Sequence, residues 1–460
     1  MNRLHGHKYT FYQQKFINFL LAFEELPVPH DGKNIAATCT AAFERFGIEK
    51  AISGGVLDNA SNNNNAMELL LQKGILLIEE LLHNRCSCHI LNLIVQDGLS
   101  LLKDQLLKLR SLCTLIRTPK RMNTFKHFVE EEFGKETPTK KYLPFPARDC
   151  PTRWNSTYNM LHTALPYQVI IDKVSDNDVR INEDEWNALS QIRVILEPFL
   201  SATENLSSKK ILSFHDVFPE ITRIMGHLSA QLQFHEETDF GSDFNHSVSA
   251  MHEKFNKYWS KVPPGDLVAH VLDPTMKLKY IQLKSPNDAT DAERTIHRIF
   301  AKYYVHLSLT PDVRSAPSIT SVNTHSNKRQ RMLELQQANV SYVKHSEIHL
   351  YLEEDVETQI TNPLQYWKVH EHRFPALAQM ARDFLAIPAS SVPSEAAFSQ
   401  AGRVLDDYRS NLDPATVSAL MLTKSWMEAC DNFNWKRPII HINMQQKEVE
   451  DPLDVDVDRH

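Results

Sequence analysis

Two carboxylates in the sequence stand where acidic side chains commonly do chemistry. Asp58 comes directly after a predicted short strand, Ile52–Leu57, and is followed by asparagines and a serine (DNASNNNN). The carboxyl end of a strand is where α/β sheets place catalytic and metal-binding groups. Alternatively, Asp58 and the asparagines form only a turn and a helix cap. Glu395 follows a Pro-Ser break and precedes a helix-like run, which predicts a carboxylate in a helical first turn.

Thiols and an imidazole lie close together at Cys86, Cys88 and His89 (CSCH). A zinc site needs further ligands at a defined spacing. The sequence has no C-x-x-C pair, and its one H-x-x-x-H pair, His345 and His349, lies far downstream. The pattern therefore predicts that no zinc finger is present and that these residues are buried at the start of a helix.

Arg153 and Trp154 form a pair in a Pro-flanked stretch (ARDCPTRWNSTYNML), with Lys140, Lys141 and Arg148 upstream. Arginine suits a phosphate and tryptophan suits the face of a base, so this pair favours contact with nucleic acid. The alternative is that the tryptophan belongs to the core.

A C-terminal helix is predicted to begin at Asp413-Pro414, which make a good N-cap and first turn, and to run through Trp426. One face of this helix is apolar, and it carries Val417, Leu420, Met421 and Met427. That face either belongs to the core or packs on another subunit.

The composition is that of a globular chain, with 42% hydrophobic and 23% charged residues in a length of 460. The longest apolar run, Phe16–Phe23, is far shorter than the roughly 18–20 residues of a membrane span, so a membrane protein is excluded. The N-terminus lacks the order of a signal peptide, and six scattered cysteines are typical of a reduced, intracellular compartment. The net charge of −7 excludes a histone-like basic coat but allows a local basic groove.

Hydrophobic spacing near the N-terminus predicts alternating strands and helices. The expected elements are a strand at Phe16–Phe23, a helix at Gly32–Ile48 and a strand at Ile52–Leu57. A strand, a crossover helix and a second strand indicate a sheet with parallel pairing.

The rest of the chain is expected to be mainly helical. Residues 66–113 and 156–260 have helical spacing, whereas Val268–Leu272 is predicted to be a short strand. Residues 307–331 are rich in Ser, Thr, Asn and Pro and poor in large apolar residues, which is typical of a disordered linker.

Taken together, these segments resemble the hAT superfamily of DNA transposases. The motifs that carry the resemblance occur in the family order and span roughly Leu20 to Trp426. They are DNASNN (Asp58–Asn63), C-x-x-H followed by HILNLIVQDGL (Cys86–Leu99), PTRWNSTYNML (Pro151–Leu161), VLDPTMKLKY (Val271–Tyr280), LQYW (Leu364–Trp367), RFP (Arg373–Pro375), FLAIPASS (Phe384–Ser391), SE (Ser394-Glu395), FS (Phe398-Ser399) and AGR (Ala401–Arg403).

The resemblance implies an α/β ribonuclease H-like core that is interrupted by a large, mainly α-helical insertion, with a helical C-terminal dimerisation segment. In active members two Asp and one Glu bind divalent metal, and Asp58 and Glu395 match the second Asp and the Glu. Clustered carboxylates suit Mg²⁺ or Mn²⁺ in phosphodiester chemistry. The same resemblance implies that Cys86 and His89 lie beside the active site, where they are expected to be DNA-binding residues.

Other residues acquire expected roles from the same resemblance. Arg153 and Trp154 match a DNA-binding motif whose tryptophan is associated with a flipped base at a hairpin end, so the expected DNA is transposon-end-like or hairpin DNA. The expected assembly is a homodimer or higher oligomer, with no membrane partner. The residues expected to form its surface are Phe398, Val417, Leu420 and Met421.

The sequence also departs from the family pattern. The first family Asp sits on the strand before the one predicted at Phe16–Phe23, and no Asp precedes Asp31. A BED-type zinc finger pattern is missing as well. The favoured hypothesis is a hAT-derived protein that binds DNA and dimerises but is catalytically incomplete. The alternatives are an active transposase whose N-terminal part is absent from this sequence, and an interaction module that acts only through its dimer surface.

Five parts of the chain are expected. They are residues 1–155 as the N-terminal part of the core with its first strand missing, 156–306 as the helical insertion leading back to the core, 307–345 as a disordered linker, 346–430 as the dimerisation region with a core-completing segment, and 431–460 as an acidic tail. The basic cluster Lys328–Arg331 in the linker and the DNA-directed family favour the nucleus.

Overall fold

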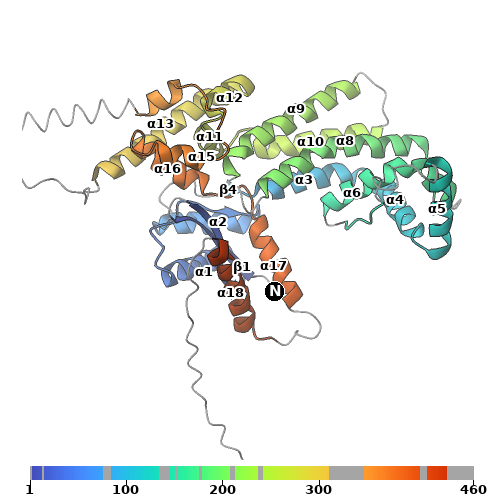
Figure 1. Ribbon diagram of the computed structural model, residues 1–460, viewed down its shortest axis with the longest axis horizontal. Coiled ribbons are helices and arrows are strands. Elements are labelled where there is room, and N and C mark those ends of the chain that lie inside the picture. The colour runs from blue at the N-terminus through green and yellow to red at the C-terminus, as the bar shows by residue number, and fades with distance from the viewer. Residues whose placement is uncertain are drawn as a thin grey trace, which may run out of the picture.

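The structure is a computed structural model of the chain, and its segments gather into two lobes (Figure 1). It describes residues 3–12, 15–75, 84–133, 145–151, 153–175, 179–207, 213–236, 242–309, 347–404 and 412–432. Most of the predicted linker, the basic cluster Lys328–Arg331 and most of the predicted acidic tail lie outside these residues. No helix in the described part of the chain is long and apolar enough to cross a membrane.

The N-terminal strands form a hairpin. Strand β1 (Arg3–Tyr12) pairs antiparallel with β2 (Lys15–Glu25), with an irregularity between Gly6 and His7. The strand predicted at Phe16–Phe23 is therefore confirmed, whereas the expectation that no strand precedes it is corrected. The sequence of β1 (RLHGHKYTFY) has no continuous apolar run, and only its Tyr, Thr and Phe residues favour a strand.

Parallel pairing occurs at a different place from the one expected. Strand β3 (Val56–Leu57) pairs parallel with β4 (Asn84–Arg85), and helix α2 (Ser61–Gln72) lies between them in the chain. The described partner of β2 is β1, so the two pairs form separate two-stranded sheets.

Helix α1 (Gly32–Arg45) confirms the helix predicted at Gly32–Ile48. Its N-cap is Asp31, whose Oδ1 accepts a hydrogen bond from Asn34 N at 2.8 Å. Gly32 allows α1 to begin against α2, since a Cβ there would lie 2.6 Å from the Asn62 carbonyl oxygen. A small apolar core forms between the two helices, and it includes Leu26, Ile35, Ala36, Ala66, Met67, Leu70 and Ile75.

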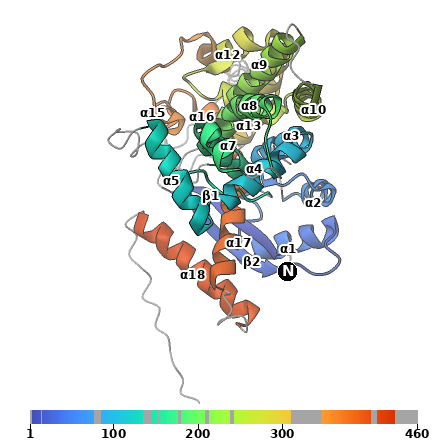
Figure 2. The same ribbon diagram turned by 90° about the vertical axis from the view of Figure 1, so that its right-hand side faces the viewer.

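The larger lobe is helical and contains most of the buried apolar residues, as the three- and four-residue spacing predicts (Figure 2). Its α-helices are α3 (Ser87–Ser100), α4 (Lys103–Leu115), α5 (Pro119–Phe133), α6 (Trp154–Ala164), α7 (Gln168–Val174), α8 (Glu183–Leu206), α9 (Val217–Glu236), α10 (Ser242–Trp259), α11 (Pro264–Val271), α12 (Lys277–Lys284), α13 (Pro286–Leu309), α15 (Pro363–Val369) and α16 (Pro375–Leu385). Short 3-10 helices occupy Leu165–Tyr167 and Phe214–Asp216.

The strand predicted at Val268–Leu272 is wrong, because this segment belongs to α11. All residues from Gly265 to Val271 are buried. A helix that is covered on every side has no polar face, so its apolar run cannot be distinguished from a buried strand by periodicity.

The motif VLDPTMKLKY is held against the later helices by buried hydrogen bonds. The Lys277 ammonium is almost fully buried and donates to the carbonyl oxygens of Tyr351 (2.9 Å) and Glu354 (3.2 Å). The Trp367 indole donates to the Leu272 carbonyl oxygen at 2.8 Å. Burial lowers the pKa of Lys277. These contacts give the motif a packing role.

The C-terminal helices α17 (Val392–Val404) and α18 (Pro414–Asn432) return to the smaller lobe, where α18 packs on β2 (Figure 2). Side chains of α18 satisfy backbone groups of that strand. Ser425 Oγ accepts from Leu20 N at 2.8 Å, the Trp426 indole donates to Leu20 O at 2.7 Å, and Ser418 Oγ donates to Phe23 O at 2.7 Å. The two ends of the described chain therefore share one small core.

Candidate functional site

Asp58 lies at the carboxyl end of β3 and is exposed. Its Oδ1 accepts hydrogen bonds from Ala60 N (2.9 Å) and from Asn63 Nδ2 (2.7 Å). These bonds shape the turn into α2, as the turn interpretation of this sequence predicts. The same geometry keeps the carboxylate at the carboxyl end of the strand, which is where a catalytic or metal-binding carboxylate would lie.

Cys86 joins three segments at this end of the strands. Its backbone N–H donates to Leu57 O at 2.9 Å, directly before Asp58. Its Sγ caps α3 by accepting from His89 N at 3.4 Å, and it also accepts from Ser391 N at 3.3 Å. The side chain is 0% exposed, and burial raises its pKa, so the thiol is neutral and structural.

The segment before Glu395 is the third of these segments. Ala389 O accepts from Ser87 N at 3.1 Å, which ties this segment to the start of α3. The Ser391 hydroxyl donates to Glu395 Oε1 at 2.9 Å, and Glu395 is exposed in the first turn of α17. The chain of contacts through Cys86 and Ser391 thus brings Asp58 and Glu395 into one neighbourhood at the carboxyl ends of β3 and β4.

These two carboxylates do not amount to a metal centre by themselves. Within the described ranges, no three His, Cys, Asp or Glu side chains are grouped so that they could hold a metal ion. The donor set therefore does not fit the two-Asp, one-Glu arrangement that the family resemblance implies, and no catalytic step is derived through a metal.

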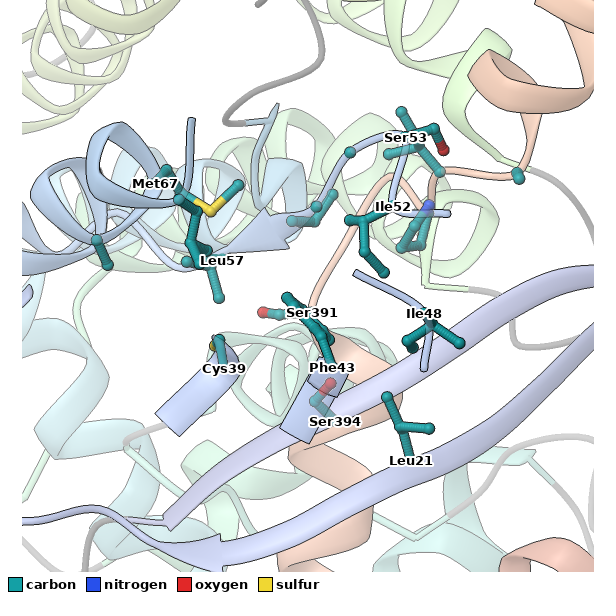
Figure 3. A pocket seen from close by; sticks show the side chains of 18 of the residues that line it. Leu21, Cys39, Phe43, Ile48, Ile52, Ser53, Leu57, Met67, Ser391 and Ser394 are labelled. Atoms are coloured by element: carbon teal, nitrogen blue, oxygen red, sulfur yellow. The ribbon is translucent and has the colours of Figure 1, made fainter. Parts of the chain in front are cut away.

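An apolar pocket of about 180 Å³ lies beside this neighbourhood (Figure 3). Leu21 of β2, Phe43 of α1, Leu57 of β3 and Met67 of α2 converge on it, and Ser391 provides a polar group. The pocket is mainly a gap between the strands and the helices that cover them.

Sequence reasoning missed Ser391. It correctly predicts from local residues that Cys86 is buried at the start of a helix, and only the family motif places Cys86 beside the active site. The signal for Ser391 was weak, since it is one of several serines in FLAIPASS. Its position four residues before Glu395 is the spacing at which helical side chains meet. Its other contact, to Cys86, crosses 305 residues of chain, and no local pattern predicts such a contact.

The expected DNA-binding residues lie in different environments. Arg153 is exposed and immediately precedes α6, while Trp154 is 4% exposed and packs in the core of the helical lobe. Cys86 is buried and His89 is half-buried. The burial of Trp154 and Cys86 leaves neither side chain a free face for DNA in this structure.

The expected dimerisation residues are divided between core and surface. Val417 and Met421 are 0% and 4% exposed and pack with Leu20 and Phe23 of β2, so their contribution to a dimer surface is corrected to an intrachain one. Leu420 is 48% exposed, as expected of a surface residue. Phe398 and Met427 are also exposed.

Comparison with known proteins decides the family. Three family models match successive parts of the chain: a ZBED1 RNase-like helical domain (residues 84–195), a hAT-like transposase RNase-H fold (215–307) and the hAT family C-terminal dimerisation region (347–427). These matches support the hAT transposase superfamily as the family of this chain. The hAT match supports a ribonuclease H-like fold in a mostly helical chain, while the boundaries at 155 and 306 stay predictions.

Proteins similar to this chain come from plants and a fungus. "Putative AC transposase" of Zea mays is 28% identical over 447 residues, which cover 89% of this chain and 53% of the relative. "Zinc finger BED domain-containing protein RICESLEEPER 3" of Oryza sativa subsp. japonica is 26% identical, covering 90% and 57%. "Putative transcriptional regulator tpeD" of Talaromyces stipitatus is also 26% identical, covering 88% and 49%. The chain thus spans about half the length of these relatives.

These matches correct one expectation about cofactors. The sequence pattern predicts no zinc finger, but several hAT relatives are named zinc finger BED domain-containing proteins, and the matched helical domain is that of a ZBED1 protein. The prediction that no zinc finger is present is therefore wrong. It was drawn from Cys and His spacing in 460 residues, whereas the relatives are considerably longer.

Proposed function

We propose that this hAT protein binds DNA in the nucleus, self-associates through its C-terminal region, and has an incomplete set of catalytic carboxylates in this chain. The observation that carries the proposal is the neighbourhood around Cys86, which joins the strand end bearing Asp58 to the helix bearing Glu395. The carboxyl ends of parallel strands are the usual ligand-binding edge of α/β sheets.

Support for DNA as the ligand comes from the named functions of the relatives. One is named a putative transposase and another a putative transcriptional regulator. A role on nuclear DNA would agree with both names. The expected ligand is a DNA end or hairpin, held at the edge that carries Asp58 and Glu395. Arg153 remains an exposed candidate contact.

Self-association is assigned to the outer face of α18 and the adjoining part of α17. The matched dimerisation region ends at residue 427, within α18. The inner face of α18 is occupied by β2, so an interface must use the side chains that remain outside. Leu420 and Met427 are large, exposed apolar residues of α18. Phe398 of α17 is partly exposed, and its ring also contacts Phe23 of β2. Burying them against a second copy would remove apolar area from water.

The proposed catalytic deficit rests on the identity of the carboxylates. Asp58 and Glu395 match two of the three that active hAT members use, and strand β1, which precedes β2, contains no Asp. Two carboxylates bind a divalent cation more weakly than three, so strand cleavage by this chain is expected to be lost.

The test is a titration of a fluorescently labelled DNA hairpin with the purified chain, read by anisotropy and followed by a cleavage assay with Mg²⁺ or Mn²⁺. The proposal predicts binding that weakens as salt rises and leaves the hairpin uncut. Absence of binding would contradict it. Cleavage that disappears in both Asp58→Asn and Glu395→Gln would contradict the catalytic part alone.

A second candidate function is that of an active cut-and-paste transposase. It is favoured by one observation, namely that the chain spans about half the length of relatives such as "Putative AC transposase". Sequencing the 5′ end of the transcript separates the two. An in-frame segment that adds an Asp-bearing strand and a Cys/His finger supports the second candidate, and a transcript that begins close to the Met1 codon supports the first.

A further inference from the structure

An exposed arginine, Arg85, lies at the same strand ends as Asp58 and has no role in the site described above. Arg85 is the last residue of β4, and its register partner on β3 is Leu57, the residue before Asp58. Arg85 also directly precedes Cys86, which joins this edge to the segment of Glu395. The guanidinium is therefore carried by the same pair of strand ends as Asp58.

Arg85 forms no ion pair or side-chain hydrogen bond with the residues that the structure describes. Its side chain is exposed, and the ion pairs and side-chain hydrogen bonds formed among the described ranges involve other arginines, such as Arg110 with Asp149. Asp58 directs its Oδ1 to the turn, and Glu395 accepts from Ser391. A guanidinium that has no partner in the described part of the chain keeps its donors available for an incoming anion.

A second side chain at this edge also lacks partners. The amide of Asn59 has both Oδ1 and Nδ2 buried with no hydrogen-bond partner in the part of the chain that the structure describes. Its neighbour Asn63, in contrast, donates to Asp58. An unpaired buried amide lowers stability, so its presence next to Asp58 is explained if a ligand supplies the partner.

We propose that Arg85 and Asn59 form a binding site for the sugar-phosphate backbone of DNA at the carboxyl ends of β3 and β4. The planar guanidinium of Arg85 donates two parallel hydrogen bonds to one phosphate. The amide of Asn59 turns toward the same strand of DNA and donates to a neighbouring phosphate oxygen. Arg85 offsets the repulsion that Asp58 and Glu395 exert on the backbone, and it fixes the strand across the carboxylates. The inference rests on the proposed function.

The first test compares Arg85→Gln with Arg294→Gln in the full chain. Arg294 is an exposed arginine of the helical lobe that pairs with Asp291, and its replacement is the matched control. Arg85→Gln is expected to weaken binding of a labelled hairpin by about tenfold and to reduce the slope of log affinity against log salt by about one. Arg294→Gln should leave both unchanged, and Arg85→Lys should recover part of the affinity because it keeps the charge.

The outcomes separate this inference from the proposed function. If the wild-type chain fails to bind the hairpin, the proposed function fails. If the wild type binds and Arg85→Gln binds equally well with the same salt slope, the arginine site is overturned while the proposed function stands. Because Arg85 is exposed, the two glutamine variants should have equal melting temperatures. Equal melting temperatures would show that a loss of affinity in Arg85→Gln does not come from a folding defect.

The second test uses Asn59→Ala, with Asn63→Ala as the matched control. Asn59 makes no side-chain hydrogen bond in the described fold, so its replacement should keep or raise the melting temperature while it weakens hairpin binding. Asn63→Ala removes a bond to Asp58 and should lower the melting temperature. Unchanged hairpin affinity in Asn59→Ala would overturn the role of this amide.

Discussion

At the residue scale, Trp154 has a side-chain type that suits two roles. Its indole suits a stacked base, and its size suits a core. In the structure it is 4% exposed and packs in the helical lobe, directly after the exposed Arg153. Arg153 therefore lies at the surface, and Trp154 lies in the core.

Replacement of Trp154 by Ala tests whether Trp154 is a core residue. It should lower the free energy of unfolding by about 3–5 kcal/mol, since it leaves a large cavity. Urea denaturation measures the loss, and Arg153→Ala, a change at the surface, is the control. Unaltered stability together with weakened hairpin binding would show that the indole stacks on DNA instead.

Asp266 gives a second prediction at this scale. It lies in the first turn of α11, is 5% exposed, and burial raises its pKa from 3.8 to about 7. The folded chain therefore keeps a proton that the unfolded chain releases between about pH 4 and pH 7. Because the native state binds more protons in this window, the free energy of unfolding falls as pH rises through it, by about 1.4 kcal/mol for each pH unit.

Asp266→Asn should remove this contribution. The free energy of unfolding, measured in urea at about pH 5 and about pH 8, should fall less steeply with pH in the variant than in the wild type. Asp184→Asn, at an exposed position in the first turn of α8, is the control. Parallel pH profiles for wild type and Asp266→Asn would contradict the effect of burial. Glu347, whose pKa burial also raises to about 7, acts in the same direction and is left unchanged.

At the element scale, α18 has one face that packs on β2 and one that is exposed. Val417 and Met421 pack against β2, and Ser418, Ser425 and Trp426 bind its backbone. These hydrogen bonds hold α18 on the backbone of β2. The opposite face carries the exposed Leu420, and it is the face that we propose for self-association.

Substitution of adjacent residues on α18 separates the roles of these two faces. Met421→Ala should lower the free energy of unfolding by about 2–5 kcal/mol because Met421 is buried. Leu420→Glu should leave stability nearly unchanged and disrupt self-association, because Leu420 is 48% exposed. Denaturation and sedimentation velocity measure the two effects. A Leu420→Glu chain that still self-associates would place the interface on another surface.

The elements also show what local sequence can predict. Asp31 and Gly32 mark the start of α1, and the apolar run at Phe16–Phe23 marks β2, so both elements were predictable. The polar strand β1 and the fully buried helix α11 lack the amphipathic pattern on which such predictions depend. Asp58 could be placed at a strand end because the apolar pair Val56-Leu57 before it forms β3.

At the scale of the whole molecule, contacts distant in sequence assemble both the core and the candidate site. Ser391 reaches Cys86 across 305 residues, and Trp426 reaches Leu20 across 406. No periodicity carries such pairings, so the resemblance to the hAT family was needed to bring Asp58 and Glu395 together. The zinc-finger expectation, in contrast, came from local Cys and His spacing, and the named relatives correct it.

The central claim is that this chain binds DNA as a self-associated protein. Sedimentation velocity of the full chain mixed with a labelled DNA hairpin tests both parts in a single measurement. We predict that the label sediments with a complex that contains at least two copies of the chain, and that added salt releases it. A label that sediments as free DNA at low salt, or a complex with a single copy of the chain, would contradict the claim.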